Sequence, residues 1–211
     1  MHVEILVEEP SAAELLRILA PELLGPEVSF EIRVFQGKPD LLRQLPGRLR
    51  AYPSWLPHAY GSRWCVVVLV DEDREDCRAL KQELEDFARG VGLTTVSQVR
   101  AGAPGPYHVV NRIAVEEIEA WFFGDVDALR AAYPRVAATL GAKAAYRDPD
   151  AIAGGTAEAL ERELRPHYPA GMPKVEVART IAPHMDPDRN RCHSFQVFRD
   201  TLRGIARSAA P

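Results

Sequence analysis

The sequence predicts an α/β fold in which a parallel-rich central sheet is flanked by helices and followed by a helical C-terminal part. Segments rich in β-forming residues alternate with segments of helical periodicity through residues 1–125, which is the pattern of βαβ units. The segment RWCVVVLVDED, residues 63–73, is a continuous apolar run typical of the buried centre of a parallel sheet.

The N-terminal elements follow in order. Residues 2–9, HVEILVEE, form the first expected strand, and residues 11–25, SAAELLRILAPELLG, carry leucines at helical spacing. Residues 28–37, VSFEIRVFQG, alternate between apolar and polar side chains and predict a second strand. Residues 39–55 are interrupted by prolines, so we expect one short helix there, followed by a loop that contains Trp55, Pro57 and Gly61.

After the central apolar strand, residues 74–92 predict an amphipathic helix that ends near glycine. We expect a further strand at residues 93–102, LTTVSQVRAG, and a loop at residues 103–109. The period of residues 111–125, NRIAVEEIEAWFFGD, predicts a helix, and Asp125 marks the start of another.

From Ala131 onward we expect short helices separated by proline and glycine, with a last helix from about Ser194 to Arg207. We interpret the chain as a single domain. Residues 1–125 form its α/β core and carry an acidic site, and residues 126–211 form a mainly helical extension.

The composition is that of a globular protein, with 46% hydrophobic and 27% charged residues among 211. The longest strongly apolar run is too short to cross a bilayer, so we expect no membrane association. The N-terminus lacks the pattern of a signal peptide, and we therefore expect a cytoplasmic location. Three cysteines form neither a paired framework nor a CxxC zinc motif, so we expect reduced thiols, with Cys65 in the core.

The charge is unevenly distributed along the chain. The formal net charge is −4, but residues 172–211 contain seven Lys and Arg against four acids, which leaves the rest of the chain at −7. A basic tail beside an acidic body would bring a polyanion close to carboxylates. The alternative is a solvated helix face without a ligand.

Acidic residues stand where two of the expected strands end. Glu8 follows the apolar residues of the first strand, and Asp71 and Asp73 follow those of the central strand. Ligands of open α/β sheets bind outside the carboxyl ends of the strands, so these acids are expected to converge. Crowded carboxylates repel one another, and a hard divalent cation such as magnesium would relieve that repulsion.

Helix capping is the alternative explanation for some of these acids. Residues 11–14, SAAE, match a capping box, so Glu14 would close a helix N-terminus, and Asp73 could act as an N-cap. Capping requires neither Glu8 nor Asp71, which occupy the last strand positions.

A glutamate after the first strand, followed by D-x-D after a hydrophobic strand, resembles the Toprim domain of topoisomerases, primases and OLD-type nucleases. The segments ILVEEPSAAELL, VVVLVDED, IAVEEIEAWFFGD and CHSFQVFRDTL more narrowly resemble the DUF4276 family of Toprim-like bacterial proteins. This resemblance covers most of the chain and places Glu119 near the site, with Trp121 packed beneath it and Asp125 at the helix end. Toprim domains usually have glycine after the first glutamate, whereas this chain has Glu9 followed by Pro10.

The resemblance implies phosphoryl-transfer chemistry with Mg²⁺ or Mn²⁺ on DNA, RNA or a small phosphate compound. Glu8, Asp71 and Asp73 would hold the metal, and Glu119 would complete a second metal position. Lys174 is the candidate to offset charge on the phosphate, and the alternative is that it is an ordinary exposed lysine. Glu8 could instead be a general acid or base. Glu116 and Glu117 are expected to face solvent.

The resemblance also implies a partner. Toprim-like proteins of this kind often accompany ABC or AAA ATPases in prokaryotic defence or DNA-processing modules, and a homo-oligomer is compatible with it. The chain itself has no P-loop, because residues 151–160, AIAGGTAEAL, lack its lysine and spacing. The competing hypothesis is a catalytically inactive Toprim-like subunit that docks on such an ATPase.

Overall fold

A computed structural model describes residues 1–61, 63–73 and 75–209 of the chain. Its centre is a four-stranded sheet in the order β2-β1-β3-β4, and every neighbouring pair is parallel. The strands are β1 (His2–Val7), β2 (Ser29–Val34), β3 (Trp64–Asp71) and β4 (Val109–Ala114). This arrangement confirms the predicted α/β class with a parallel central sheet.

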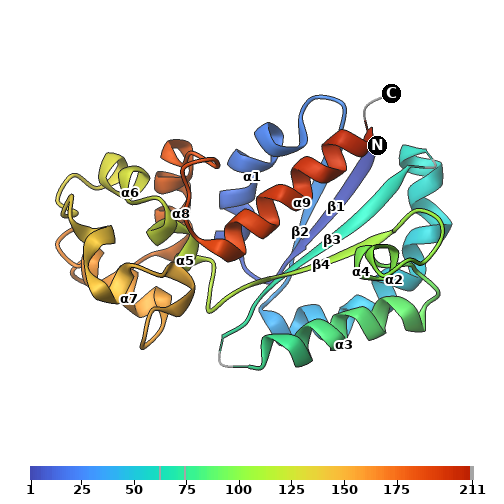
Figure 1. Cartoon of the computed structure of the whole chain (residues 1–211), viewed down its shortest axis with the longest axis horizontal. Coiled ribbons are helices and arrows are strands. Elements are labelled where there is room, and N and C mark those ends of the chain that lie inside the picture. Colours follow the sequence, from blue (N-terminus) through green and yellow to red (C-terminus); the bar gives the residue numbers. More distant parts are fainter. Residues whose placement is uncertain (62, 74, 210–211) are drawn as a thin grey trace.

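Helices cover both faces of the sheet (Figure 1). The first face is covered by α1 (Pro10–Leu24) and α9 (His193–Ala209), and the second by α2 (Lys38–Tyr60) and α3 (Cys77–Gly90). Successive side chains of β1 enter opposite cores, with Ile5 on the first face and Leu6 on the second. Every residue of β1 and β3 is buried. For β3, the apolar run of residues 63–73 predicts this burial.

The helix α2 is longer than predicted. The chain runs as one helix from Lys38 to Tyr60 through Pro46, Pro53 and Pro57, so the expectation of a short helix and a loop is wrong. A proline inside a helix costs about 3 kcal/mol. That cost is offset here because one face of the helix is buried against the sheet, through Leu41, Leu45, Leu49, Tyr52 and Leu56.

The prediction also fails between residues 93 and 118. Residues 93–102 form no strand but contain the short helix α4 (Val96–Arg100). Thr95 and Gln98 form a capping box at its start, which favours a helix over an extended segment. Residues 109–114, for which a helix was expected in part, form β4, and that helix, α5 (Glu119–Gly124), begins later.

The remaining elements lie mainly at the carboxyl ends of the strands (Figure 1). They include the helices α6 (Val126–Ala132), α7 (Thr156–Leu164) and α8 (Lys174–Ile181), with 3-10 turns η1 (Leu140–Ala142), η2 (Ala144–Tyr146), η3 (Pro149–Ala151) and η4 (Ala182–His184). These short helices and the long final helix agree with the sequence prediction. Along the described parts of the chain, no helix is both long and apolar enough to cross a membrane.

Candidate functional site

The strands that end in acids are neighbours, as predicted. β1 and β3 pair in parallel with Val7 opposite Leu69, which brings the residues after β1 beside the end of β3. The Asp71 backbone N–H donates a hydrogen bond to Oε1 of Glu8. The first acid of each motif therefore lies at one edge of the sheet.

Three carboxylates at this edge are buried, and we call them the acidic cluster: Glu8, Asp71 and Glu119. Their exposed fractions are 6%, 5% and 1%. Burial raises the pKa of Glu8 to about 7, although the Asp71 N–H and Lys38 oppose the shift. Burial also raises the pKa of Asp71 well above its ordinary range, and the charges of Glu8 and Glu119 add to this effect.

Glu119 is held at the start of α5 by the packing of that helix. Trp121 lies two residues further on, donates from Nε1 to Oγ of Ser194 at 3.0 Å, and packs against Phe195 and Phe198. Burial raises the pKa of Glu119 to about 7. Its Oε2 atom is buried, and no described residue hydrogen-bonds to it.

Lys174, at the start of α8, lies next to the acidic cluster. Its Nζ atom is 3.3 Å from Oε1 of Glu119, 3.4 Å from Oε1 of Glu117 and 3.9 Å from Oε2 of Glu9. These three acids raise the pKa of Lys174 although partial burial opposes the shift, so the ammonium group stays charged. Lys174 therefore places a cation beside the acidic cluster and is not an ordinary exposed lysine.

Glu117 was expected to face solvent, but its side chain is bound within the protein. Its Oε2 atom accepts hydrogen bonds from the Thr156 hydroxyl at 3.2 Å and from the Ala157 N–H at 2.8 Å. The carboxylate thus binds the free N–H groups at the start of α7, an interaction that the local sequence around Glu117 cannot reveal. Glu116 is partly buried like Glu117, and its backbone N–H donates to Oε2 of Glu72.

A second lysine, Lys38, was missed by the sequence analysis. It is 6% exposed, and its Nζ atom lies 2.6 Å from Oδ2 of Asp73 and 3.1 Å from Oε1 of Glu75. The available signal was its position, because Gly37-Lys38 closely follows β2 and therefore reaches the same edge of the sheet.

Asp73 differs from the other predicted ligands because its side chain is 51% exposed and paired with Lys38. Its φ of 55° places it in the left-handed region, which reverses the chain after β3. It is not the N-cap of α3. That role belongs to Asp76, which accepts hydrogen bonds from the N–H groups of Arg78 and Ala79.

Glu9, which replaces the glycine usual in Toprim domains, causes no backbone strain. Its φ of −128° and ψ of 151° are ordinary extended values, as expected for a residue before proline. Glu9 is the N-cap of α1, and its side chain accepts from the Ser11 hydroxyl at 3.2 Å but from no backbone N–H of the helix, so the expected capping box does not form. Glu14 instead pairs with Arg17 and Arg179 on the outside of α1.

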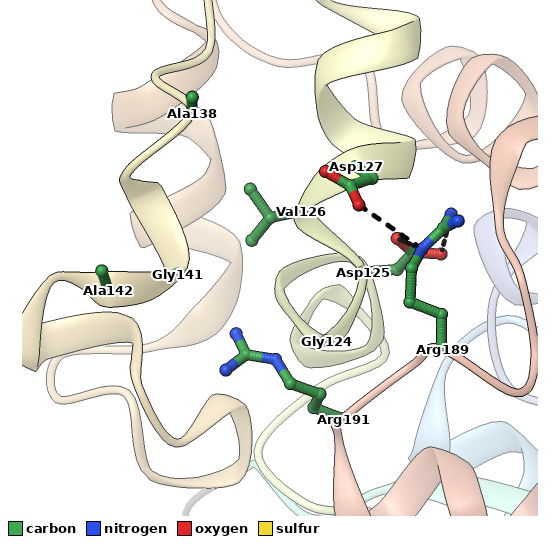
Figure 2. A pocket seen from close by; sticks show the side chains of 9 residues that line it. All are labelled: Gly124, Asp125, Val126, Asp127, Ala138, Gly141, Ala142, Arg189 and Arg191. Atoms are coloured by element: carbon green, nitrogen blue, oxygen red, sulfur yellow. Dashed lines mark hydrogen bonds and ion pairs between the residues drawn. The ribbon is translucent and has the colours of Figure 1, made fainter.

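Asp125 is not part of the acidic cluster, and its partners give it a structural role. It is 1% exposed, caps α6 through the Ala128 N–H, and receives two hydrogen bonds from the Arg189 guanidinium at 2.8 and 2.9 Å. Figure 2 shows this pair on one wall of a small pocket. In the basic tail, Arg199 and Arg203 pair with Asp188, which reduces the charge available for a polyanion.

The ligand atoms of the acidic cluster are of the kind that a hard cation prefers, because they are carboxylate oxygens. One of them, Oε2 of Glu119, has no hydrogen-bond partner among the described residues. Across residues 1–61, 63–73 and 75–209, no three His, Cys, Asp or Glu side chains are already gathered in a metal-ligating arrangement. Side-chain rotation of Glu8 or Asp73 would therefore have to accompany metal binding.

A family model described as "Domain of unknown function (DUF4276)" matches residues 7–203. The chain belongs to the DUF4276 family. No curated protein matches this DUF4276 chain. Among solved structures, it is similar to the C-terminal region of the Xanthomonas campestris pv. campestris OLD protein, with 15% identity and a TM-score of 0.48 over 98% of this chain and 96% of the other.

Proposed function

We propose that this DUF4276 protein binds Mg²⁺ or Mn²⁺ at the acidic cluster and hydrolyses a phosphodiester of DNA or RNA. The observation that carries the proposal is the burial of three mutually repelling carboxylates, Glu8, Asp71 and Glu119, at the carboxyl edge of a parallel sheet. Such a group is costly without a cation, and strongly perturbed carboxyl pKa values are characteristic of functional sites.

The residues of the chain divide into two roles in this proposal. Glu8, Asp71 and Glu119 would hold the metal, with Asp73 joining them if it leaves Lys38. A bound divalent cation polarises a phosphoryl oxygen and lowers the pKa of its water. Lys174, beside Glu119, and Lys38, beside Asp73, would stabilise negative charge on the phosphate.

Glu8 is the candidate for proton transfer. Its pKa of about 7 means that both protonation states are populated near neutral pH, as an efficient general acid or base requires. The Asp71 N–H holds one of its oxygens, which fixes the orientation of the carboxyl group.

An ATPase of the ABC or AAA type is the proposed partner. The support is the family resemblance of the sequence together with the absence of a P-loop motif from its 211 residues. In this arrangement ATP hydrolysis by the partner would control when nucleic acid reaches the acidic cluster.

A second candidate is a non-catalytic docking subunit, and the two lysines favour it. Lys38 already pairs with Asp73, and Lys174 with Glu119, so part of the acidic charge is neutralised without a metal. In this case the edge would be a fixed network of ion pairs that stabilises the fold.

The nuclease and the docking subunit are distinguished by comparing the wild type with the Asp71→Asn variant. Thermal melting with and without metal is measured first, and cleavage of nucleic acid second. A ligand present at 100 times its Kd stabilises the folded state by about 2.7 kcal/mol, so the wild-type melting temperature should rise when Mg²⁺ or Mn²⁺ is added. Asp71→Asn should lose this rise, whereas Glu83→Gln, which removes one exposed carboxylate on α3, should keep it.

The same three proteins are then tested for cleavage of labelled single-stranded and duplex oligonucleotides, alone and with any ATPase encoded beside the gene. The proposal predicts metal-dependent cleavage that Asp71→Asn abolishes and Glu83→Gln retains. An identical metal response of the wild type and Asp71→Asn, without cleavage by either, would establish the docking subunit instead.

A further inference from the structure

A second pocket lies at the free edge of β4, between α3 and α9, and we call it the edge pocket. It encloses about 330 Å³ and is lined chiefly by Arg78 and Lys81 of α3, Arg112 and Ile113 of β4, and Val197 of α9. Figure 1 shows β4 running between these two helices. None of these residues belongs to the acidic cluster.

The two arginines that line the edge pocket form no ion pair with a carboxylate of the described residues. Arg112 is 8% exposed and donates to Oγ1 of Thr201 at 2.6 Å and to the Asn111 carbonyl at 2.8 Å. Among the described residues, no carboxylate oxygen lies within 4.0 Å of the guanidinium nitrogens of Arg78, Arg100 or Arg112, although Asp76 accepts the backbone N–H of Arg78. Burial and the nearby charge of Arg100 lower the pKa of Arg112 to about 10.

Glu85 is the carboxylate whose charge acts on Arg112, and one of its oxygens is already bound by other groups. Its Oε1 atom forms an ion pair with the Lys81 ammonium at 2.8 Å. The same atom accepts hydrogen bonds from the Asn111 amide and the Ser97 hydroxyl, each at 3.1 Å. The edge pocket therefore keeps a net positive charge, mainly from arginine, which suits the geometry of phosphate oxygens.

The edge pocket is adjacent to the acidic cluster across one strand. Asp71 of β3 stands opposite Ala114 of β4, and the pocket-lining residues Ile113 and Val115 flank Ala114. Neighbouring β-strands are about 4.8 Å apart, so a bound nucleic-acid strand could extend from one site to the other. Burial and the neighbouring Glu72, which directly follows Asp71, raise the pKa of the pocket residue Cys77.

We infer that the edge pocket binds a phosphate group of the same nucleic-acid strand whose phosphodiester is cleaved at the acidic cluster. The inference rests on the proposed function and adds to it the path of the substrate. The exposed Val197 side chain and Ile113 offer apolar surface to the sugar beside that phosphate.

The hydrogen bonds of β4 favour nucleic acid over an acidic peptide. A peptide would bind a free sheet edge by adding a strand, which requires unpaired backbone groups. The outward carbonyl of Asn111 already accepts from Lys81 at 2.7 Å and from Arg112 at 2.8 Å. These two side chains block strand addition at this position while their cationic groups stay beside the pocket.

The test is Arg78→Glu, with Arg50→Glu as the matched control. Both arginines are exposed, so the formal charge change is equal, but Arg50 lies on α2, away from the pocket. Glutamate is compatible with the first turn of α3, where the helix dipole favours negative charge, so the variant is expected to fold.

Binding is measured by fluorescence anisotropy with a labelled single-stranded oligonucleotide and a matching duplex, in EDTA, over a series of KCl concentrations. Arg78→Glu should weaken binding about tenfold and reduce the slope of log K against log salt by about 0.7 for the single strand. Arg50→Glu should match the wild type.

The two proposals fail separately. Loss of binding in Arg78→Glu, with no cleavage by the wild type in Mn²⁺, would support the edge pocket and reject the proposed activity. Cleavage by the wild type, with unchanged oligonucleotide binding and KM in Arg78→Glu, would overturn the edge pocket alone. Equally tight binding of a polyglutamate peptide, with the same loss in Arg78→Glu, would also overturn it.

Discussion

Replacing Glu8 with glutamine should stabilise the metal-free protein at alkaline pH. Glu8 is 6% exposed, and its pKa rises from an ordinary value of 4.5 to about 7 on folding. The folded state therefore holds a proton that the unfolded state releases between these two values, and stability falls as the pH rises through this window. Well above pH 7, the ionised Glu8 carboxylate lowers the free energy of unfolding by the full amount that corresponds to the difference between its folded and unfolded pKa values.

The magnitude follows from the shift. One pKa unit corresponds to about 1.4 kcal/mol, so the upper limit is about 3 kcal/mol at pH 8. Glutamine keeps an acceptor for the Asp71 N–H and removes one of the charges that add to burial in raising the pKa of Asp71. Its amide must also find acceptors, and we therefore expect a gain of about 2 kcal/mol, or about 4–8 °C in melting temperature.

The assay is thermal unfolding in EDTA at pH 8 and pH 5, with Glu83→Gln as the control. At pH 5 the gain of Glu8→Gln should fall below about 1 kcal/mol, because the wild-type carboxyl is then protonated in the folded state. Glu83→Gln should change little at either pH, since that side chain is exposed. A destabilised Glu8→Gln protein, or a gain that is equal at both pH values, would refute the reasoning.

Three further predictions concern the same edge and its support. Lys174→Met should destabilise the protein by about 2 kcal/mol at pH 8 and less at pH 5 in thermal melts, because the Glu119 carboxylate loses a cation 3.3 Å away; Mg²⁺ should restore part of the loss. Gly124→Ala should lower the melting temperature strongly, since its Cβ would lie 2.0 Å from Oδ1 of Asn190, and Gly47→Ala, in open space, should not. Titration calorimetry in buffers of different ionisation enthalpy should show that Mg²⁺ binding releases more protons at pH 6.5 than at pH 8.5, because Glu8 and Glu119 have pKa values of about 7.

The parts of the fold that could be predicted from the sequence are those that depend on local pattern. The apolar run of β3 and the acids that follow it predicted both a buried parallel strand and the edge where Glu8 and Asp71 meet. The continuity of α2 could not be predicted, because it depends on burial of one helix face against a sheet formed by distant segments. The β-forming residues around Thr95 predict a strand, whereas the capping box of Thr95 and Gln98 starts a helix there.

The site was predictable in its acids but not in its lysines. Acids at strand ends are recognised by their position, whereas Lys38 reaches Asp73 across 35 positions of sequence. Glu117 likewise faces the site because it binds the start of α7, which no pattern near residue 117 indicates. Long-range ion pairs of this kind depend on how the elements pack, and that information is spread over the whole chain.

The charge balance at the edge explains why two functions remain in competition. Six carboxylates meet two ammonium groups there, from Lys38 and Lys174, and the carboxylates are those of Glu8, Glu9, Asp71, Asp73, Glu117 and Glu119. Fully ionised, this group would carry an excess of four negative charges, and the raised pKa values show that protons relieve part of it when no metal is bound. Protons, lysines and divalent cations therefore compete for the same oxygens. A docking subunit needs the first two alone, whereas a nuclease must exchange its protons for metal at the pH at which it works.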